Sequence, residues 1–381
     1  MSILTQIWAI AEYVLPFLFV LSLVVFFHEL GHFLIGRWRG VKVDAFSLGF
    51  GPEILGFNDR YGTHWRIAVF PLGGYVKFHG DANGASMPDQ EALAGMSAQD
   101  RAVSFIAKKV WERAAIVAAG PLANFVLAIV IFTGIFYING RAILLPEVDS
   151  ISSDSAAEAA GFRPGDLILA IGETPIDSFE EMQRIVQTEA DTPLRFTILR
   201  DGKELQLTAT PRRSEVSTAF GQTRMGILGV QSQGKPENWH IQHYGLAGSG
   251  QQAGSETWYV IARTASYIKG LFAGTESTDQ LSGPIRIAEV SGAMAKIGFG
   301  AVLNLAAILS ISVGMLNLLP IPLLDGGHLF YYAVEAIRGK AMNDKAQQFG
   351  FRIGLMLVTS LLIFTTYNDI LRLTRQLMHW G

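Results

Sequence analysis

Four apolar segments are the feature that most constrains this chain, because three of them are long enough to cross a lipid bilayer and the fourth approaches that length. A transmembrane helix needs about 20 mainly apolar residues. Hydropathy predicts spans over residues 8–35, 114–138, 297–319 and 353–367, the last of which is short. Only 17% of the residues are charged, against about 25% in soluble domains. The sequence therefore predicts a polytopic α-helical membrane protein with about four transmembrane helices.

The flanks of the first span predict its orientation. No Lys or Arg precedes the apolar run and no small-residue cleavage site follows it, which is unlike a cleaved signal peptide. Basic residues gather instead between the first two spans: Arg37, Arg39, Lys42, Arg60, Arg66, Lys77, Arg101, Lys108, Lys109 and Arg113. By the positive-inside rule we expect an external N-terminus and a cytoplasmic first loop. Four spans return the C-terminus to the outside, although Arg372 and Arg375 favour the opposite.

Ionisable residues occur near the end of the first span, in the stretch FFHELGHFLIG from Phe26 to Gly36. His28 and His32 are four residues apart and share one helical face, with Glu29 beside them. In the HExxH pattern two histidines bind zinc and the glutamate serves as the base. The alternative is a helix end with interfacial histidines and a snorkelling glutamate. Ionisable groups inside an apolar helix need partners, which favours the metal site.

A third metal ligand must come from elsewhere, and the chain has no cysteine to supply it. The stretch MLNLLPIPLLDGGH ends the third span, where Pro320 and Pro322 break the helix. Asp325 follows them and is the best third ligand, although a membrane-exit turn would also explain an Asp-Gly-Gly sequence. The amide of Asn317 could hold a substrate carbonyl or oxyanion. The other histidines are interpreted as structural, with His328 the strongest competitor as a ligand: His64, His79, His240, His243, His328 and His379.

Two regions outside the spans are predicted to fold. The first loop alternates like strands from His64 around a turn at Gly73 and Gly74, which predicts a β-hairpin near the membrane. Residues 141–213 predict an α+β domain, with a strand at 167–171, a helix from Ser178 and a hairpin turning at Asp201 and Gly202. Residues 258–272 have the apolar spacing of an amphipathic helix on the outer surface.

Three motifs together resemble the site-2 protease family of intramembrane zinc metalloproteases. They are HELGH in the first span, GPLANF from Gly120 in the second and NLLPIPLLDGGH in the third. The resemblance is nearest to the bacterial branch that acts on anti-sigma factors. It implies Zn2+ held by His28, His32 and Asp325, with Glu29 activating water. It also places Asn317 in the family motif and implies that His328 is not a ligand.

The resemblance extends to the regions outside the spans. Residues 141–213 resemble a bacterial PDZ domain through GFRPGDLILAIGETPI, and only one such domain is found where many relatives have two. Gly73, Gly74 and Tyr75 resemble the family's membrane-associated β element, so we expect them to bind substrate. The fold class is thus a helical membrane protein with a β-hairpin region and an inserted PDZ domain.

The predicted divisions alternate between membrane and aqueous segments. They are a first transmembrane helix with HExxH (1–36), a cytoplasmic loop with the hairpin (37–111), a second transmembrane helix (112–138), the PDZ domain (141–213), a linker with the amphipathic helix (214–296), a third transmembrane helix (297–322), the DG motif and a cytoplasmic loop (323–352), and a fourth transmembrane helix with the tail (353–381).

The expected function is regulated intramembrane proteolysis in the bacterial inner membrane. The substrates would be single-span membrane proteins, such as anti-sigma factors after a first cleavage, with the active site toward the cytoplasm and the PDZ domain in the periplasm. The net charge of −3 and the lack of a basic face predict no nucleic-acid partner. A metal transporter would carry His, Asp and Glu in several spans, which are nearly free of them here. A non-catalytic PDZ scaffold would tolerate loss of Glu29.

Overall fold

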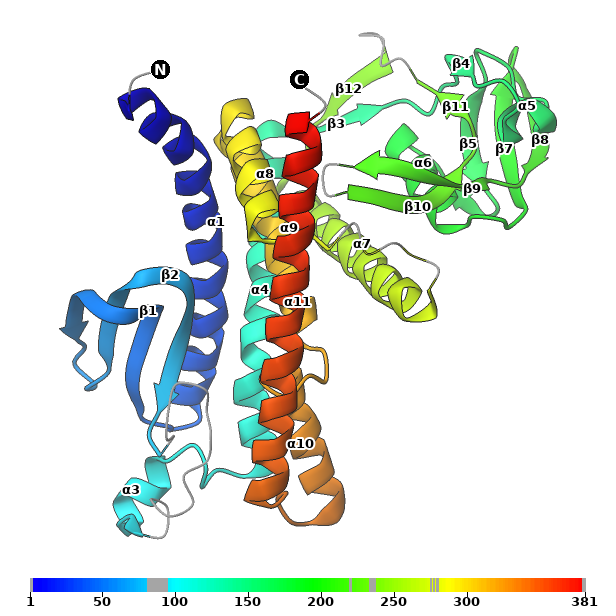
Figure 1. The fold of residues 1–381 in the computed structure, drawn as a ribbon. Coiled ribbons are helices and arrows are strands. Elements are labelled where there is room, and N and C mark those ends of the chain that lie inside the picture. The colour runs from blue at the N-terminus through cyan, green and yellow to red at the C-terminus, as the bar shows by residue number, and fades with distance from the viewer. Residues whose placement is uncertain are drawn as a thin grey trace. The chain divides into compact units, whose positions relative to one another are not determined.

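The computed structural model describes residues 3–80, 95–218, 221–232, 238–274, 276, 278 and 281–378 (Figure 1). The chain divides into two compact units. The first comprises Met1–Thr133, Gly250–Ala265 and Ser282–Gly381, and the second comprises Gly134–Ser249 and Ser266–Leu281. His379 lies outside the described residues.

Four helices are long and apolar enough to cross a membrane, as the sequence predicts. They are α1 (Ile3–Trp38), α4 (Val110–Asn139), α9 (Phe299–Asn317) and α11 (Asp344–Met378). The candidate span in α11 covers Lys345–Arg375 and is longer than the predicted 353–367, because the helix continues through polar residues at both ends.

The third span begins later than predicted. A separate helix, α8 (Pro284–Ile297), precedes it, so residues 284–296 are helical rather than part of a linker. Gly298 ends α8 with φ of 144°, a conformation that side-chain-bearing residues rarely adopt. α9 then starts at Phe299. The predicted start at residue 297 is within two residues of this break.

Small residues allow α1, α4 and α9 to pack closely, as is common between membrane helices. A Cβ added to Gly31 of α1 would lie 2.3 Å from the carbonyl oxygen of Ala119 on α4. A Cβ added to Gly314 of α9 would lie 3.1 Å from the carbonyl oxygen of Pro121. The backbones of the three helices therefore approach one another where the metal-ligating candidates lie.

The C-terminal helix holds α8 in place through polar contacts. The buried carboxylate of Asp369 accepts the backbone N–H of Arg286 at 2.9 Å and that of Gly283 at 3.3 Å, so a side chain of α11 caps the start of α8. Arg372 adds an ion pair with Glu289 at 2.6 Å. On α10 (Asp325–Arg338), Glu335 pairs with Arg113 of α4 at 2.6 Å. These contacts fix the helices around the centre of the first unit.

The first loop forms a sheet from two strongly bent strands, β1 (Val43–Asn58) and β2 (His64–Phe78). Residues 45–48 of β1 pair with residues 74–77 at the end of β2, and the two segments run in opposite directions. The same residues also pair with 64–67 at the start of β2, and there the two segments run in the same direction. β2 must therefore reverse direction between these segments, and Gly73 lies in the reversal with φ of 141°. The predicted turn at Gly73 and Gly74 is present, within a sheet more folded than one hairpin. α3 (Ala98–Val103) follows it.

The second unit contains a four-stranded sheet in the order β6-β5-β7-β8. The predicted strand is β5 (Leu167–Ile171), and the predicted helix is α6 (Phe179–Thr188), with Ser178 as its N-cap. The predicted turn at Asp201 and Gly202 joins β7 to β8, where Arg200 pairs with Lys203. The remaining elements are β3 (Arg141–Leu144), β4 (Ser150–Ile151), α5 (Ala156–Ala160), β6 (Thr174–Pro175), β7 (Leu194–Arg200) and β8 (Lys203–Ala209).

Strands continue beyond Arg213, into the region that the sequence assigned to a linker. They are β9 (Arg212–Thr218), β10 (Gly221–Ile227), β11 (Val230–Gln231) and β12 (Trp239–Gln242). β11 pairs with β4 and β12 pairs with β3, and Leu228 is buried in the same core as Ile168. Non-local strand pairing is invisible to composition, which is polar here. α7 (Leu246–Ala273) follows and contains the predicted helix at 258–272.

Candidate metal centre

The two histidines of the HExxH pattern lie one turn apart on α1 and face each other. His28 and His32 are 9% and 8% exposed, and their Nε2 atoms are 3.2 Å apart. Trp38, where the candidate span ends, follows His28 by ten residues, so His28 lies about 15 Å inside the end of that span. The paired imidazoles are therefore buried within an apolar helix, as the spacing predicted.

Asp325 reaches the histidines because the chain turns tightly between α9 and α10. Pro320 and Pro322 prevent the helix from continuing, and Leu323 has an unusual φ of 113°. A Cβ on Gly326 would lie 2.2 Å from the carbonyl oxygen of Leu319, and one on Gly327 would lie 2.4 Å from that of Ile321. The two glycines after Asp325 are thus required by the turn, which brings the carboxylate back toward α1.

The three candidate ligands converge on one point. Asp325 Oδ2 lies 3.1 Å from His28 Nε2, and Asp325 Oδ1 lies 3.5 Å from His32 Nε2. Ligands at about 2.0–2.2 Å from zinc in tetrahedral geometry are about 3.3–3.6 Å apart. The observed separations are 3.1 Å from Asp325 Oδ2 to His28 Nε2, 3.2 Å between the two Nε2 atoms and 3.5 Å from Asp325 Oδ1 to His32 Nε2, which lie within about 0.2 Å of this spacing. The set of two nitrogens and one oxygen leaves one coordination position open, as in catalytic zinc sites.

The hydrogen bonds of His32 and Asp325 are also compatible with a bound cation. His32 Nδ1 donates to the carbonyl oxygen of Ile116 at 2.9 Å, so its Nε2 presents a lone pair in the neutral ring. Asp325 Oδ2 is buried and, among the described residues, accepts no hydrogen bond of good geometry, although His28 Nε2 lies 3.1 Å away. The lone pair of His32 Nε2 therefore faces Asp325 Oδ1, 3.5 Å away, without a proton between them, and a divalent cation placed there would be attracted to both atoms.

Glu29 lies at the same centre but is not one of the converging ligands. Its carboxylate accepts the backbone N–H of Val76 and interacts electrostatically with His28, His32 and Asp325. A Cβ on Gly74 would lie 3.2 Å from Glu29 Cγ, so β2 passes directly over this glutamate. The β element and the HExxH pattern, which are about 45 residues apart in the sequence, are brought together here.

The other predicted site residues lie at increasing distance from the centre. Asn317 is adjacent, with Nδ2 at 3.4 Å from His28 Nε2. Gly74 contacts α1, whereas Gly73 packs against the ring of Phe50, and Tyr75 stacks on the same ring with centroids 6.1 Å apart. The structure therefore brings Asn317 and Gly74 to the centre and places Gly73 and Tyr75 on the sheet beside it.

Besides Ile116, two residues of α4 contact the histidines and were not singled out individually from the sequence. Asn124 is fully buried, and its Nδ2 lies 3.3 Å from His28 Nδ1. Gly120 packs so tightly that an added Cβ would lie 2.2 Å from His32 Nε2. The signal available in the sequence was an asparagine inside an apolar span, since polar groups there need partners.

The remaining histidines do not join the metal-ligating group within the described residues. His64 pairs with Glu53 at 2.8 Å and His79 with Asp44 at 3.3 Å, as structural histidines do. His328 is near Tyr331, with ring centroids 6.4 Å apart. His240 and His243 belong to the second unit.

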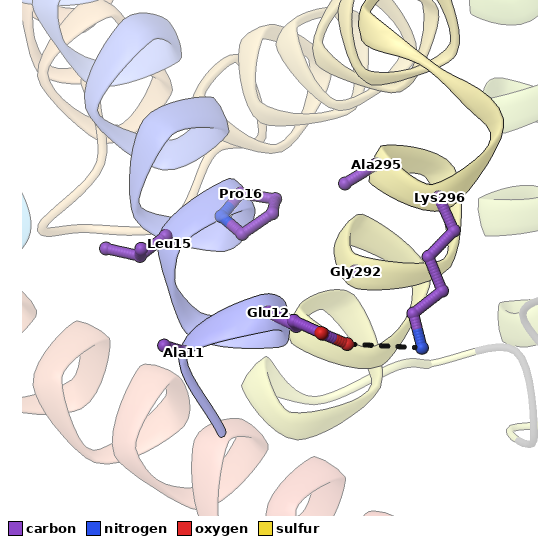
Figure 2. Close-up of a pocket in the computed structure, with 7 residues that line it drawn as sticks. All are labelled: Ala11, Glu12, Leu15, Pro16, Gly292, Ala295 and Lys296. Atoms are coloured by element: carbon purple, nitrogen blue, oxygen red, sulfur yellow. Dashed lines mark ion pairs between the residues drawn. The ribbon is translucent and has the colours of Figure 1, made fainter. Parts of the chain in front are cut away.

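A separate cavity of about 290 Å3 lies between α1 and α8 (Figure 2). Pro16 and Gly292 line it, and the ion pair of Glu12 with Lys296, at 3.5 Å, crosses its edge. Its residues on α1 precede His28 by about four helical turns, so the cavity is not part of the metal centre.

Comparison with known proteins agrees with this geometry. The sequence model of peptidase family M50 matches residues 16–361. A protein of Agrobacterium fabrum named "Putative zinc metalloprotease" is 47% identical over 94% of this chain and 95% of its own length. A Rhizobium meliloti protein with the same description is 46% identical, over 94% of this chain and 96% of its own. The metalloprotease MmpA of Caulobacter vibrioides is 39% identical, over 93% of this chain and 94% of its own. The chain therefore belongs to peptidase family M50, the site-2 protease family, and is a membrane-embedded zinc metalloprotease.

Proposed function

We propose that this zinc metalloprotease cuts single-span membrane proteins within the bilayer. The observation that carries the proposal is the position of the ligand set. His28 and His32 lie inside a candidate membrane span, and Asp325 is brought to them by the turn after another span. A protease that acts on soluble chains has no need to place its metal ligands at that depth. The site is therefore suited to peptide bonds that lie in the membrane.

The residues of the centre divide the chemistry among them. His28, His32 and Asp325 would hold zinc, which when bound polarises the scissile carbonyl and promotes attack by water at neutral pH. Glu29 accepts the proton of the attacking water and delivers it to the leaving amine. The amide of Asn317, next to His28, donates to the oxyanion that develops on the carbonyl.

The β element is proposed to capture the substrate. A transmembrane helix hides its peptide bonds, so the segment to be cut must first unwind. Within the described residues, the 74–78 segment of β2 pairs with a strand on one side only. A free strand edge can add an extended peptide through backbone hydrogen bonds. Since Gly74 packs on Glu29, a peptide added at this edge would lie close to the general base.

The substrate class and the cellular setting complete the proposal. We place the protein in the bacterial inner membrane, with the active site toward the cytoplasm, because basic residues gather between α1 and α4. The α+β fold at 141–213 supports a PDZ domain, which would then lie in the periplasm and select substrates. The substrates would be anti-sigma-factor-like single-span proteins after a first cleavage, in regulated intramembrane proteolysis.

A reconstituted assay tests the proposal. The purified chain would be placed in liposomes with zinc and a single-span model substrate, and the products would be mapped by mass spectrometry. We expect cleavage inside the apolar segment of the substrate, and no cleavage with Glu29→Gln. Cleavage confined to soluble segments would contradict the proposal. Zinc flux across the liposome without cleavage would indicate a transporter instead.

A further inference from the structure

Asn124 contacts a candidate metal ligand but has no role in the mechanism proposed above. It is fully buried in α4, and its amide meets the ring nitrogen of His28 that points away from the metal site, Nδ1, at 3.3 Å. Its Oδ1 is buried without a hydrogen-bond partner among the described residues. A buried polar atom without a partner destabilises the folded state, so its presence here calls for a functional reason.

The Nδ1 atoms of His28 and His32 have different hydrogen-bond partners. The Nδ1–H of His32 has a permanent acceptor, the carbonyl oxygen of Ile116, which fixes its tautomer. His28 meets an amide instead, and an amide can either donate or accept. As placed, Asn124 Nδ2 donates to Nδ1, which would put the ring proton on Nε2 and direct it at the metal site. That tautomer is unable to bind a cation through Nε2.

Rotation of the Asn124 amide by 180° would allow His28 to bind a cation through Nε2. The oxygen and nitrogen of an asparagine amide occupy nearly equivalent positions, and the hydrogen-bond network decides between them. Each orientation leaves one amide atom unpaired among the described contacts, so the amide itself favours neither strongly. A neutral His28 bound through Nε2 must carry its proton on Nδ1, and Oδ1 of Asn124 is then at the right place to accept it.

We propose that Asn124 is the positioning residue of His28, accepting the Nδ1–H through Oδ1 and so fixing the tautomer in which Nε2 binds zinc. The inference rests on the proposed site, with His28 as a ligand. Outer contacts of this kind typically change metal affinity about 10–100-fold when they are lost. Both histidines would then be oriented by α4, one through a main-chain carbonyl and the other through a side chain.

The test is zinc affinity in detergent, measured by competition with a chromophoric chelator. We expect Asn124→Ala and Asn124→Leu to weaken binding about 10–100-fold. Asn124→Asp keeps an acceptor oxygen at the same position and should bind within about tenfold of the wild type. Ser310→Ala is the matched control, because Ser310 is buried beside Asn124 and donates only to its main-chain carbonyl, at 2.9 Å. This control should bind zinc like the wild type.

A second measurement uses the wild-type protein alone, so it tests the inference even if the Asn124 variants do not fold. Nitrogen NMR of the wild-type protein with labelled histidine and bound zinc should show His28 protonated at Nδ1. Wild-type affinity in Asn124→Leu, or a deprotonated Nδ1 in the loaded protein, would overturn the inference alone. Failure of the wild type to bind zinc would overturn the proposed site as well.

Discussion

Glu29 is the ionisable side chain of the centre to which we assign a role other than binding metal. It follows His28 in the chain and interacts with the charges of all three ligands, yet it is not among the converging atoms. Glu29→Gln keeps the shape of the side chain and removes its ability to take a proton. We expect zinc content to stay at the wild-type level and the cleavage rate to fall by about 10²–10⁴-fold.

Initial rates on a single-span substrate and zinc per chain in the same preparation check this expectation. Cleavage at the wild-type rate would mean that another group serves as the base. Loss of zinc in this variant would instead make Glu29 part of the metal-binding set.

Residue spacing predicted part of the centre, and packing supplied the rest. His28 and His32 followed from the period of a helix, and Asp325 from the prolines that break one. The hydrogen bond of Ile116 and the amide of Asn124 depend on how α4 is rotated against α1. Sequence spacing within one helix carries no information on its rotation against another, so these contacts were not predicted.

At the scale of the helices, the contact of α1 with α4 determines whether the imidazoles fit. Gly120→Ala would place a methyl group 2.2 Å from His32 Nε2, so the ring must move away from the metal position. We expect zinc affinity to fall by at least about tenfold, in line with the sensitivity of metal sites to ligand orientation. Gly134→Ala is the control on the same helix, because no heavy atom lies within 4 Å of its added Cβ.

Chelator competition on both variants measures the difference. The control should keep the wild-type affinity and slightly favour the helix, since alanine is the better helix former. Equal affinities for the two variants would show that the close approach of α4 does not constrain His32.

Hydropathy and turn chemistry predicted most elements but not all of them. The four apolar helices, the turn at Gly73 and the strand at 167–171 all correspond to observed elements. The boundary before the third span was predicted within two residues of the observed break at Gly298, but the helix that precedes it, α8, was assigned to a linker. The double pairing of β1 residues 45–48 was missed because register between bent strands depends on contacts far apart in sequence.

At the scale of the whole molecule, residues 141–242, which form the strands of the second unit, can be removed as a block. Arg141 of β3 pairs with Gln242 of β12, so the two ends of the segment 141–242 lie about 5 Å apart and a short Gly-Ser linker can join them. We expect the shortened protein to keep its zinc and to change which substrates it cuts. If the proposed PDZ domain excludes large ectodomains, substrates that retain them should be cut more readily.

Zinc content and cleavage of paired substrates, with and without a folded ectodomain, check this expectation. Loss of zinc would show that the second unit supports the fold of the first. An unchanged preference between the two substrates would contradict a role in selection. The deletion must extend to residue 242 because removal of 141–213 alone would leave β11 and β12 without the strands they pair with.

The central claim is that His28, His32 and Asp325, from opposite ends of the chain, hold one zinc ion inside the membrane helices. The most direct test is zinc per chain by elemental analysis after dialysis, for the wild type and for Asp325→Ala in parallel. The account predicts about one zinc per wild-type chain and a large loss in the variant, since a two-histidine site lacks its third ligand. Equal zinc in the two proteins would contradict it.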